Sequence, residues 1–438
     1  MHPWIPLLII FGITYALIAS EKVDKTIAAG LGAAAAIMLH YVPYEKAMEH
    51  VDLNVIFLLI GMMVIVNVLS TTGLFQWVAV VIARKARGNG PVILVSLLLA
   101  TAFLSAFLDN VTTVILISPI TILICQVLEI HAIPVLILEA VFSNIGGTAT
   151  LVGDPPNILI GSRAGLSFNE FLVNLTPPVL LIMAISVVVV FFLFGRGLKV
   201  KEAAKARIMA TEPRLAIIDP RRMYIGLSVF CLILLGFFLG RVLGIEPGIV
   251  ALAGALLMVL ACRADLHYCL GKVEWNTILF FISLFMLIGA LQEAGLFQFL
   301  GQEVISLTRG NLMLTTLVVL WVSAIASAIV DNIPLVIAMI PLIQSIIPTF
   351  ATQMGYAGDP QMIHTHITYP LYWALALGAC LGGNGTLIGA SANVVICQIA
   401  RKNRYPITFW QFTRLGFPMM ILSLVISSAY IYLRYFLW

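Results

Sequence analysis

Charged residues are scarce in this sequence. Asp, Glu, Lys and Arg make up 10% of its 438 residues, whereas a soluble domain carries about 25%. Hydrophobic residues make up 61%, and the mean hydropathy is +1.07. The apolar runs are long and unbroken, unlike the alternating ~10-residue segments of an outer-membrane barrel. We therefore expect a polytopic, all-α membrane protein that lies in a lipid bilayer and has no nucleic-acid partner.

Catalytic and metal-binding patterns are also missing. The six cysteines are scattered, mostly in apolar runs, and none has zinc-type spacing or a histidine partner. The glycine-rich stretch GGNGTLIG at 382–389 lacks the spacing and the βαβ context of a nucleotide-binding loop. No pair of nucleophile and base is visible. The sequence predicts no enzyme activity, no catalytic residue, no cofactor and no bound metal.

A long internal repeat is the main feature that the sequence does contain. The stretch AFLDNVTTVILIS at 106–118 has a second copy, AIVDNIPLVIAMI, 222 residues later at 328–340. Further on, GGTATLVGDPPN at 146–157 matches GGNGTLIGASAN at 382–393 with an offset of 236. Similar apolar composition does not place Gly, Asp, Asn and Pro in register. We interpret the chain as two related halves.

Each half is predicted to hold five membrane spans and one re-entrant hairpin. The hairpins cover about 91–128 and 311–349, and the Asp-Asn pairs lie in their middle. Broken spans follow at about 133–162 and 368–400. The first repeat is expected to cover 1–195, a basic cytoplasmic linker 196–222, and the second repeat 223–438. An odd number of spans in the first half inverts the second half.

The basic residues predict the orientation. With the 196–222 linker in the cytoplasm, 19 of the 24 Lys and Arg residues lie on the cytoplasmic side and 5 lie outside. Positive charge favours cytoplasmic loops. We expect a multi-pass protein of the cell inner (plasma) membrane, with both termini outside the cytoplasm. The first apolar run follows Pro and Trp rather than a basic region, so we expect it to be a retained span.

Inverted repeats with helices broken in mid-membrane are typical of secondary transporters. The broken ends leave backbone N–H and C=O groups that can bind a solute. Small polar residues and glycines gather at the breaks. The predicted substrate-binding residues are Asn110, Thr112, Thr113, Asn144, Gly146, Gly147, Thr148, Thr150, Asn157, Asn332, Gly382, Gly383, Asn384, Thr386 and Asn393.

Four acidic residues interrupt apolar sequence. Asp109 and Asp331 are a matched pair in the repeat. Asp154 aligns with Ala390, and Glu139 is a single acidic residue in an apolar stretch. Ionisable residues inside a membrane are costly and mark ion or proton pathways. We predict that these four couple transport to an ion. The alternative for Asp109 and Asp331 is a structural cap on the helix after each break, and Asp154 and Glu139 can instead serve as caps or salt-bridge partners.

LDNVTTVI followed by SNIGGTATLVGDPPNILI resembles the ion transporter superfamily. Within it, the chain is similar to the branch that holds ArsB-type arsenite permeases and the melanosomal P protein. NhaD-type Na⁺/H⁺ antiporters and the dicarboxylate/citrate permeases are more distant. The resemblance implies two hairpins and elevator-type alternating access. Dicarboxylate carriers typically have Ser-Asn-Thr at the hairpin tips, where this chain has Asp-Asn-Val and Asp-Asn-Ile.

These observations favour a proton-coupled efflux permease for arsenite or antimonite. A Na⁺/H⁺ antiporter of the same superfamily and a gated channel stay open as alternatives. The expected partners are the small inorganic solute and a coupling H⁺ or Na⁺. A cytoplasmic ATPase subunit and a homodimer stay open as well.

Overall fold

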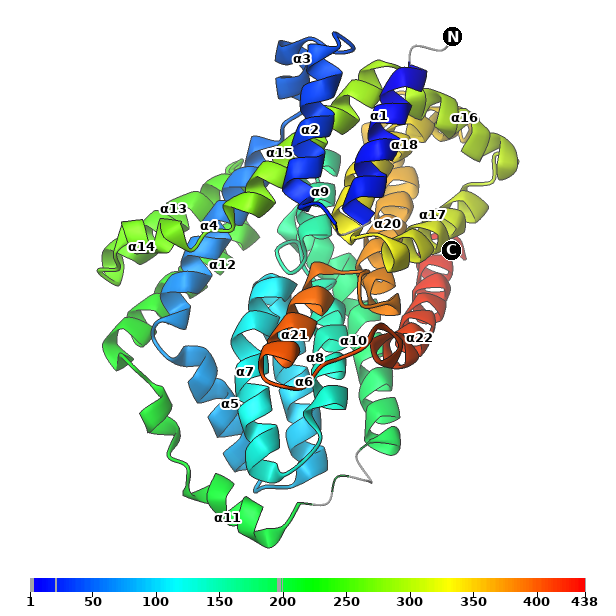
Figure 1. Ribbon diagram of the computed structural model, residues 1–438. Coiled ribbons are helices and arrows are strands. Elements are labelled where there is room, and N and C mark those ends of the chain that lie inside the picture. Colours follow the sequence, from blue (N-terminus) through cyan, green and yellow to red (C-terminus); the bar gives the residue numbers. More distant parts are fainter. Residues whose placement is uncertain (1–3, 20–21, 195–197, 199, 438) are drawn as a thin grey trace.

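The computed structural model describes residues 4–19, 22–194, 198 and 200–437, and the secondary structure in these residues is helical throughout (Figure 1). The helices of the first half are α1 (Trp4–Ala19), α2 (Lys25–Met38), α3 (Tyr44–Glu49), α4 (Leu53–Ser70), α5 (Leu74–Lys85), α6 (Gly90–Phe107), α7 (Asn110–Leu128), α8 (Ala132–Gly147), α9 (Pro155–Ala164) and α10 (Phe168–Leu193). The linker holds α11 (Glu202–Ala210) and a 3₁₀ turn, Pro213–Ala216. The predicted linker residues Arg196 and Lys199 lie outside the described residues.

The second half repeats the order of elements. Its helices are α12 (Pro220–Leu243), α13 (Pro247–Ala261), α14 (Leu266–Gly271), α15 (Trp275–Glu293), α16 (Leu296–Leu307), α17 (Leu312–Ile329), α18 (Asn332–Gln353), α19 (Pro360–Ile363), α20 (Tyr369–Gly382), α21 (Ser391–Lys402) and α22 (Phe409–Tyr435). A π-helical turn, His364–Thr368, precedes α20, and a 3₁₀ turn, Gly383–Gly385, follows it. The extra residues of this half lie in and around α19.

Among the described residues, nine helices are long and apolar enough to cross a membrane, and α6, α7, α17 and α18 are four of them. These four form the two hairpins. The predicted fold class is confirmed: the chain is an all-α polytopic membrane protein of two inverted repeats, each with five membrane segments and one re-entrant hairpin.

Matching features recur at matching places. The short helices α5 and α16 both follow a glycine, Gly73 and Gly295, whose φ is +84° in each case. This left-handed conformation suits glycine, because it has no Cβ. Pro119 in α7 and Pro341 in α18 interrupt the returning helix of each hairpin at the same distance from its start. Local backbone geometry therefore follows the sequence repeat.

Helices α4 and α13 pack closely, and so do α2 and α15. Gly61 makes the first contact possible, since a Cβ there would come within 2.6 Å of the Ala251 backbone. The two pairs are also tied at matching ends. Asn54 Oδ1 accepts from Gly248 N at 2.6 Å, and the Asn276 carbonyl accepts from Thr26 Oγ1 at 3.0 Å. We call α1, α2, α4, α12, α13 and α15 the frame.

The hairpins and broken helices form the rest of the core. Helix α8 packs against α6 and α7, and α20 packs against α17 and α18. The two halves meet where α21 crosses α7 and α8, and where α18 contacts α9 (Figure 1). Outside this core, linker helix α11 lies against α7, where Lys201 Nζ pairs with Glu129 at 2.5 Å.

Candidate functional site

The hairpin turns are short and are held by their aspartates. Only Leu108 and Asp109 separate α6 from α7, and only Val330 and Asp331 separate α17 from α18. Asp109 Oδ1 accepts from Thr112 N at 2.9 Å, and its other oxygen accepts from the Thr112 hydroxyl. Asp is a preferred N-cap because its carboxylate satisfies the free N–H groups of the first turn. Both aspartates are therefore N-caps, and Thr112 completes the first cap.

The unwound loops of the broken helices are each held by one asparagine. Asn157 Nδ2 donates to the carbonyls of Thr148 and Thr150 at 3.1 and 2.9 Å. Asn393 Nδ2 donates to the carbonyls of Gly383 and Thr386 at 2.8 and 3.0 Å. These bonds satisfy backbone C=O groups that the end of a helix leaves free. The amide hydrogens of Asn157 and Asn393 thus stabilise the loops, while their Oδ1 atoms face the centre.

Threonines tie each loop to the neighbouring hairpin. The Thr150 hydroxyl donates to the Ala106 carbonyl, and Thr386 Oγ1 donates to the Ala328 carbonyl at 2.5 Å. Thr148 Oγ1 instead donates to the Asn144 carbonyl of its own helix at 2.7 Å. The predicted threonine ligands at 148, 150 and 386 therefore each donate their hydroxyl proton to the backbone.

Glycines allow the hairpins to approach the broken helices. A Cβ on Gly146 would overlap the Ala102 carbonyl, and one on Gly382 would lie 2.5 Å from Ala324 Cα. Gly147 and Gly383 face the far side of their own loops, where a Cβ would meet the carbonyls of Gly153 and Gly389 at 2.5 and 3.0 Å. These predicted residues act through close packing, as small residues do between membrane helices.

The two halves join through a chain of side-chain amides. Asn110 Nδ2 donates to Asn144 Oδ1 at 3.1 Å. Asn144 Nδ2 lies 2.9 Å from Asn384 Oδ1 and 3.0 Å from Asn393 Oδ1. At the place that matches Asn144, Cys380 Sγ donates to Asn157 Oδ1 at 3.4 Å. The predicted asparagines of both halves therefore meet at one buried crossing.

Four helices begin at this crossing: α7, α9, α18 and α21. Their N-cap residues are Asp109, Asp154, Asp331 and Ala390. Negative charge is stabilised at a helix N-terminus, and three of the four positions hold a carboxylate. Neither α9 nor α21 has a side-chain cap bond: Asp154 makes none, and Ala390 has no polar group to make one. Asp154 is fully buried, and Asn332 Nδ2 lies 3.5 Å from its Oδ1 atom.

Three polar atoms at the crossing have no hydrogen-bond partner: the acceptors Asn110 Oδ1 and Asp154 Oδ2 and the donor Asn384 Nδ2. Each belongs to a residue that is at most 2% exposed. A buried polar group without a partner is costly. The crossing therefore offers one donor and two acceptors to a small solute.

Asp331 has a partner that sequence analysis missed. Lys25 Nζ lies 3.2 Å from Asp331 Oδ2 and 3.3 Å from Ser391 Oγ, and Ser391 donates to the same carboxylate oxygen at 2.7 Å. These residues line a cavity of about 370 Å³ that Gln398 also borders. No local pattern links Lys25 to Asp331, because the two residues are 306 positions apart in the sequence. Asp109, its counterpart, makes only local bonds among those described.

Cys380 is the second missed residue. It is fully buried in α20 beside Asn157, although the cysteines were interpreted as scattered hydrophobes. The 236-residue offset aligns Cys380 with Asn144, so the repeat itself was a signal that could have found it. Glu139, also predicted, is buried between α7 and α8 rather than at the crossing, and Thr113 is buried in the first turn of α7.

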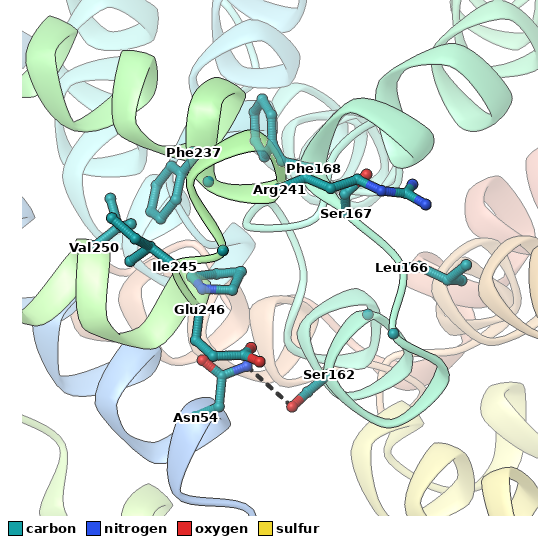
Figure 2. A pocket seen from close by; sticks show the side chains of 15 residues that line it. Asn54, Ser162, Leu166, Ser167, Phe168, Phe237, Arg241, Ile245, Glu246 and Val250 are labelled. Carbon is teal, nitrogen blue, oxygen red and sulfur yellow. Dashed lines mark hydrogen bonds between the residues drawn. The ribbon is translucent and has the colours of Figure 1, made fainter.

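A second cavity, of about 240 Å³, lies between α4, α9, α12 and α13 (Figure 2). In it Asn54 Nδ2 donates to Ser162 Oγ at 3.1 Å, which ties the start of α4 to the end of α9. Next to it, Arg163 Nε pairs with Asp52 at 3.3 Å. No group of three or more His, Cys, Asp or Glu is placed to hold a metal ion in the part of the chain that the structure describes.

The chain is similar to known transporters over nearly its whole length. It is 43% identical to an uncharacterized transporter of Mycobacterium bovis, over 98% of this chain and 97% of that protein. It is 34% identical to the P protein of Homo sapiens, over 95% of this chain and 58% of that protein. The crystal structure of the Alcanivorax borkumensis YdaH transporter superimposes with a TM-score of 0.62 at 14% identity, over 98% of both chains.

The profile of one transporter family, described as "Citrate transporter", matches residues 15–368. Sequence analysis had placed citrate permeases further away than the branch of the P protein, and both similarities are present. The predicted superfamily is confirmed, and the similarity to the P protein is consistent with the predicted branch. The protein is therefore a membrane transporter that belongs to the CitMHS citrate transporter family of the ion transporter superfamily.

Proposed function

We propose that this transporter moves arsenite or antimonite out of the cytoplasm in exchange for protons. The observation that carries the proposal is the set of unpartnered atoms at the crossing, where Asn384 Nδ2 offers a donor and Asn110 Oδ1 and Asp154 Oδ2 offer acceptors. As(OH)₃ is neutral and has hydroxyl groups that both donate and accept. The uncapped start of α21 adds backbone N–H groups to this set.

Cys380 adds to the same argument. Its thiol lies at the crossing beside Asn157, and trivalent arsenic and antimony bind sulfur. A fully charged citrate is less suited to the crossing, because three carboxylates line it and Lys25 is the cation beside them among the described side chains. Like charges at close range repel each other strongly in a low-dielectric interior.

The proposed coupling residues are the aspartates at the helix starts. A neutral solute gives the membrane potential nothing to act on, whereas a coupled charge supplies ~2.3 kcal/mol per 100 mV. Protons carried by Asp109, Asp154 or Asp331 would supply that free energy. The same acceptors favour a second candidate, a Na⁺/H⁺ antiporter, because carboxylate and amide oxygens are ligands for hard cations.

The proposed transport cycle follows from an asymmetry between the halves. In the first half the frame contacts the end of α9, through Asn54 and Ser162. In the second half it contacts the start of α21, through Lys25 and Ser391. Gln398 is the residue that matches Ser162. Ser391 and Gln398 are seven positions apart, which corresponds to about 10 Å of helix at 1.5 Å per residue. We infer that this is one end state of an elevator. In the opposite end state the frame would contact the start of α9 and the end of α21.

The proposed orientation puts α11 and the basic linker in the cytoplasm and both termini outside, in the inner membrane. In this orientation Lys25 lies at the cytoplasmic end of the frame, so the crossing opens inward in this state. The proposed repeat boundaries are 1–195 and 223–438, with the linker between them.

Transport by everted membrane vesicles tests the proposal. Arsenite, antimonite, Na⁺ and citrate are compared under an imposed pH gradient, with and without an ionophore that collapses it. We expect arsenite accumulation that needs the proton gradient and not sodium. A Na⁺-dependent pH change without arsenite movement moves the assignment to the antiporter, and gradient-driven citrate movement alone rejects arsenite as the substrate.

A further inference from the structure

Glu139 is a buried carboxyl group away from the crossing. It lies in α8, is 1% exposed, and points at α7. Ser118 of α7 lies 2.7 Å from its Oε1 atom, and its Oε2 atom has no hydrogen-bond partner. None of the described basic side chains forms an ion pair with it. A full negative charge in such a place is costly. We therefore expect Glu139 to have a function that offsets this cost.

The hydrogen-bond geometry shows where a proton fits. Ser118 Oγ lies 2.6 Å from the Val114 carbonyl as well as 2.7 Å from Glu139 Oε1. A hydroxyl has one hydrogen to donate. The Val114 carbonyl can only accept, so the hydrogen of Ser118 goes to it. The contact with Glu139 is then a hydrogen bond only if the Glu139 carboxyl group carries a proton and donates it to Ser118 Oγ. Both contacts are satisfied together only with a protonated Glu139.

Other buried hydroxyls lie on the same helix on both sides of Ser118. Thr113 lies one turn after Asp109, toward the crossing, and Thr121 lies one turn after Ser118, toward the end of α7 that contacts α11. Both are at most 1% exposed. The Thr121 hydroxyl lies close enough to the Glu139 carboxyl group to interact with it, so Ser118 and Thr121 both face Glu139 across the seam. The Thr113 hydroxyl oxygen has no hydrogen-bond partner, and it lies on another face of α7, about 140° around the helix from Ser118. Groups of this kind pass protons between hydroxyls, carboxyls and water.

The second half has no carboxyl group at the matching place. The residues that match Ser118, Thr121 and Glu139 are Ile340, Ile343 and Leu375, and all three are buried apolar side chains. The polar contact between α18 and α20 is of another kind, because the Tyr372 hydroxyl interacts there with the neutral Gln344 amide. A buried carboxyl group that faces hydroxyls is therefore a feature of the first half, on the side of the molecule where α11 lies.

We propose that the seam between α7 and α8 is a proton route between the crossing and the α11 side, with Glu139 as its carrier. Protonated Glu139 releases its proton past Thr121, and a proton from an aspartate at the crossing then restores the protonated form, so that no other bond changes. This proposal rests on the proposed proton coupling and names the residues that would serve it.

Infrared spectroscopy of the purified protein in lipid tests the route without any solute. We expect the difference between wild type and Glu139→Gln to contain a band of a protonated carboxyl group, and this band to shift within minutes of transfer to D₂O. Thr121→Val, which removes the hydroxyl and keeps the shape, is expected to slow that shift. Glu129→Gln is the matched control, because it removes a carboxyl group at the exposed end of α7. It is expected to leave the band unchanged.

Transport supplies a second readout. Two variants are tested: Glu139→Gln, and Glu139→Leu, which introduces the residue type found at the matching position 375. Both are expected to keep solute-for-solute exchange and to lose accumulation driven by a proton gradient. A missing carboxyl band, a band that exchanges no faster than the amides of α7 and α8, or unchanged gradient-driven accumulation in Glu139→Gln overturns the proposal. If wild type moves no arsenite under any gradient, the proposed substrate fails, and the infrared result still decides the route.

Discussion

The two halves of this transporter share their backbone design and differ in their charged side chains. Asn157 and Asn393 hold the two loops with the same kind of bonds, and Ser105 and Ser327 donate to the carbonyls of Ser143 and Ala379 at 2.7 and 2.6 Å. The carboxyl groups follow this symmetry only in part. Asp154 aligns with Ala390 in the repeat, and among the described residues Asp331, but not Asp109, forms an ion pair with a lysine. The repeated residues therefore set the backbone shape of the site, whereas the unmatched charged side chains make its two halves chemically different.

The largest expected effect comes from removing the shared carboxylates. Asp109→Asn and Asp331→Asn keep a good N-cap, so α7 and α18 are expected to form normally while proton-driven transport falls to the background of the assay. Vesicle uptake and thermal unfolding measure the two effects. Asp265→Asn, a cap on α14 away from the crossing, is the control. Wild-type rates with unchanged pH dependence in both variants would show that these carboxylates are only structural.

The close glycine contacts are expected to give the next largest effect. Gly146→Ala and Gly382→Ala place a methyl group against the backbone of Ala102 and Ala324. Overpacking of this kind costs typically about 1–3 kcal/mol. Gly146→Ala is expected to be the worse of the two, because its Cβ would overlap a carbonyl oxygen. Thermal unfolding in detergent measures the loss.

Gly12→Ala serves as the control for these variants, since nothing lies within 4 Å of a Cβ at that position. We expect it to unfold at the wild-type temperature or above. Equal stability of Gly12→Ala and Gly146→Ala would mean that the hairpin and the broken helix separate easily. That outcome would contradict the close packing of α6 and α8.

Breaking the frame contact of one half at a time is expected to have a smaller effect. Lys25→Gln removes the ion pair with Asp331, and Asn54→Ala removes the bond to Ser162. Hydrogen bonds of this kind contribute about 0.5–1.5 kcal/mol, and the partial exposure of Lys25 reduces its share. We expect Lys25→Gln to raise amide exchange at the start of α21 several-fold, and Asn54→Ala to do so at the end of α9.

Hydrogen–deuterium exchange followed by mass spectrometry reads both sites in one experiment. If the two contacts stabilise the same end state, the double variant shifts both sites together. An increase at the start of α21 in Asn54→Ala but not in Lys25→Gln would contradict the proposed roles of these contacts.

The smallest effect is expected where α11 meets α7. The Lys201 ammonium, which donates to Glu129, holds the pKa of that carboxyl below its usual range. A carboxyl group whose pKa is lower in the folded state adds stability above its unfolded pKa and loses it as the pH falls through the folded pKa. Docking of α11 is therefore expected to weaken below about pH 4 and in high salt. Limited proteolysis of the linker measures this.

Glu129→Gln is expected to make linker cleavage independent of pH in the acidic range. Because the pair is exposed, transport at neutral pH is expected to stay at the wild-type level. Transport that falls as strongly as in Asp331→Asn would mean that α11 takes part in the cycle itself.

Much of the fold could be predicted from local patterns. Apolar runs marked the spans, and the Asp-Asn pairs marked the hairpin turns, because an N-cap and the helix that it starts lie within a few residues of each other. The predicted hairpin limits, about 91–128 and 311–349, fall within a few residues of α6–α7 and α17–α18. The predicted linker ran to residue 222, whereas α12 begins at Pro220, so Arg221 and Arg222 lie in its first turn.

The sequence by itself determined the inverted repeat, the two hairpins and the residues at their turns, because each depends on neighbours within one or two helical turns or on a fixed offset. Only the tertiary structure decided which half holds Lys25 against its aspartate, that the Cys380 thiol contacts Asn157, and that the frame contacts the two halves in different registers. Lipid-facing and protein-facing surfaces of membrane helices are equally apolar, so the sequence does not record which helices meet. Those contacts depend on shape, and shape appears only when the whole chain is packed.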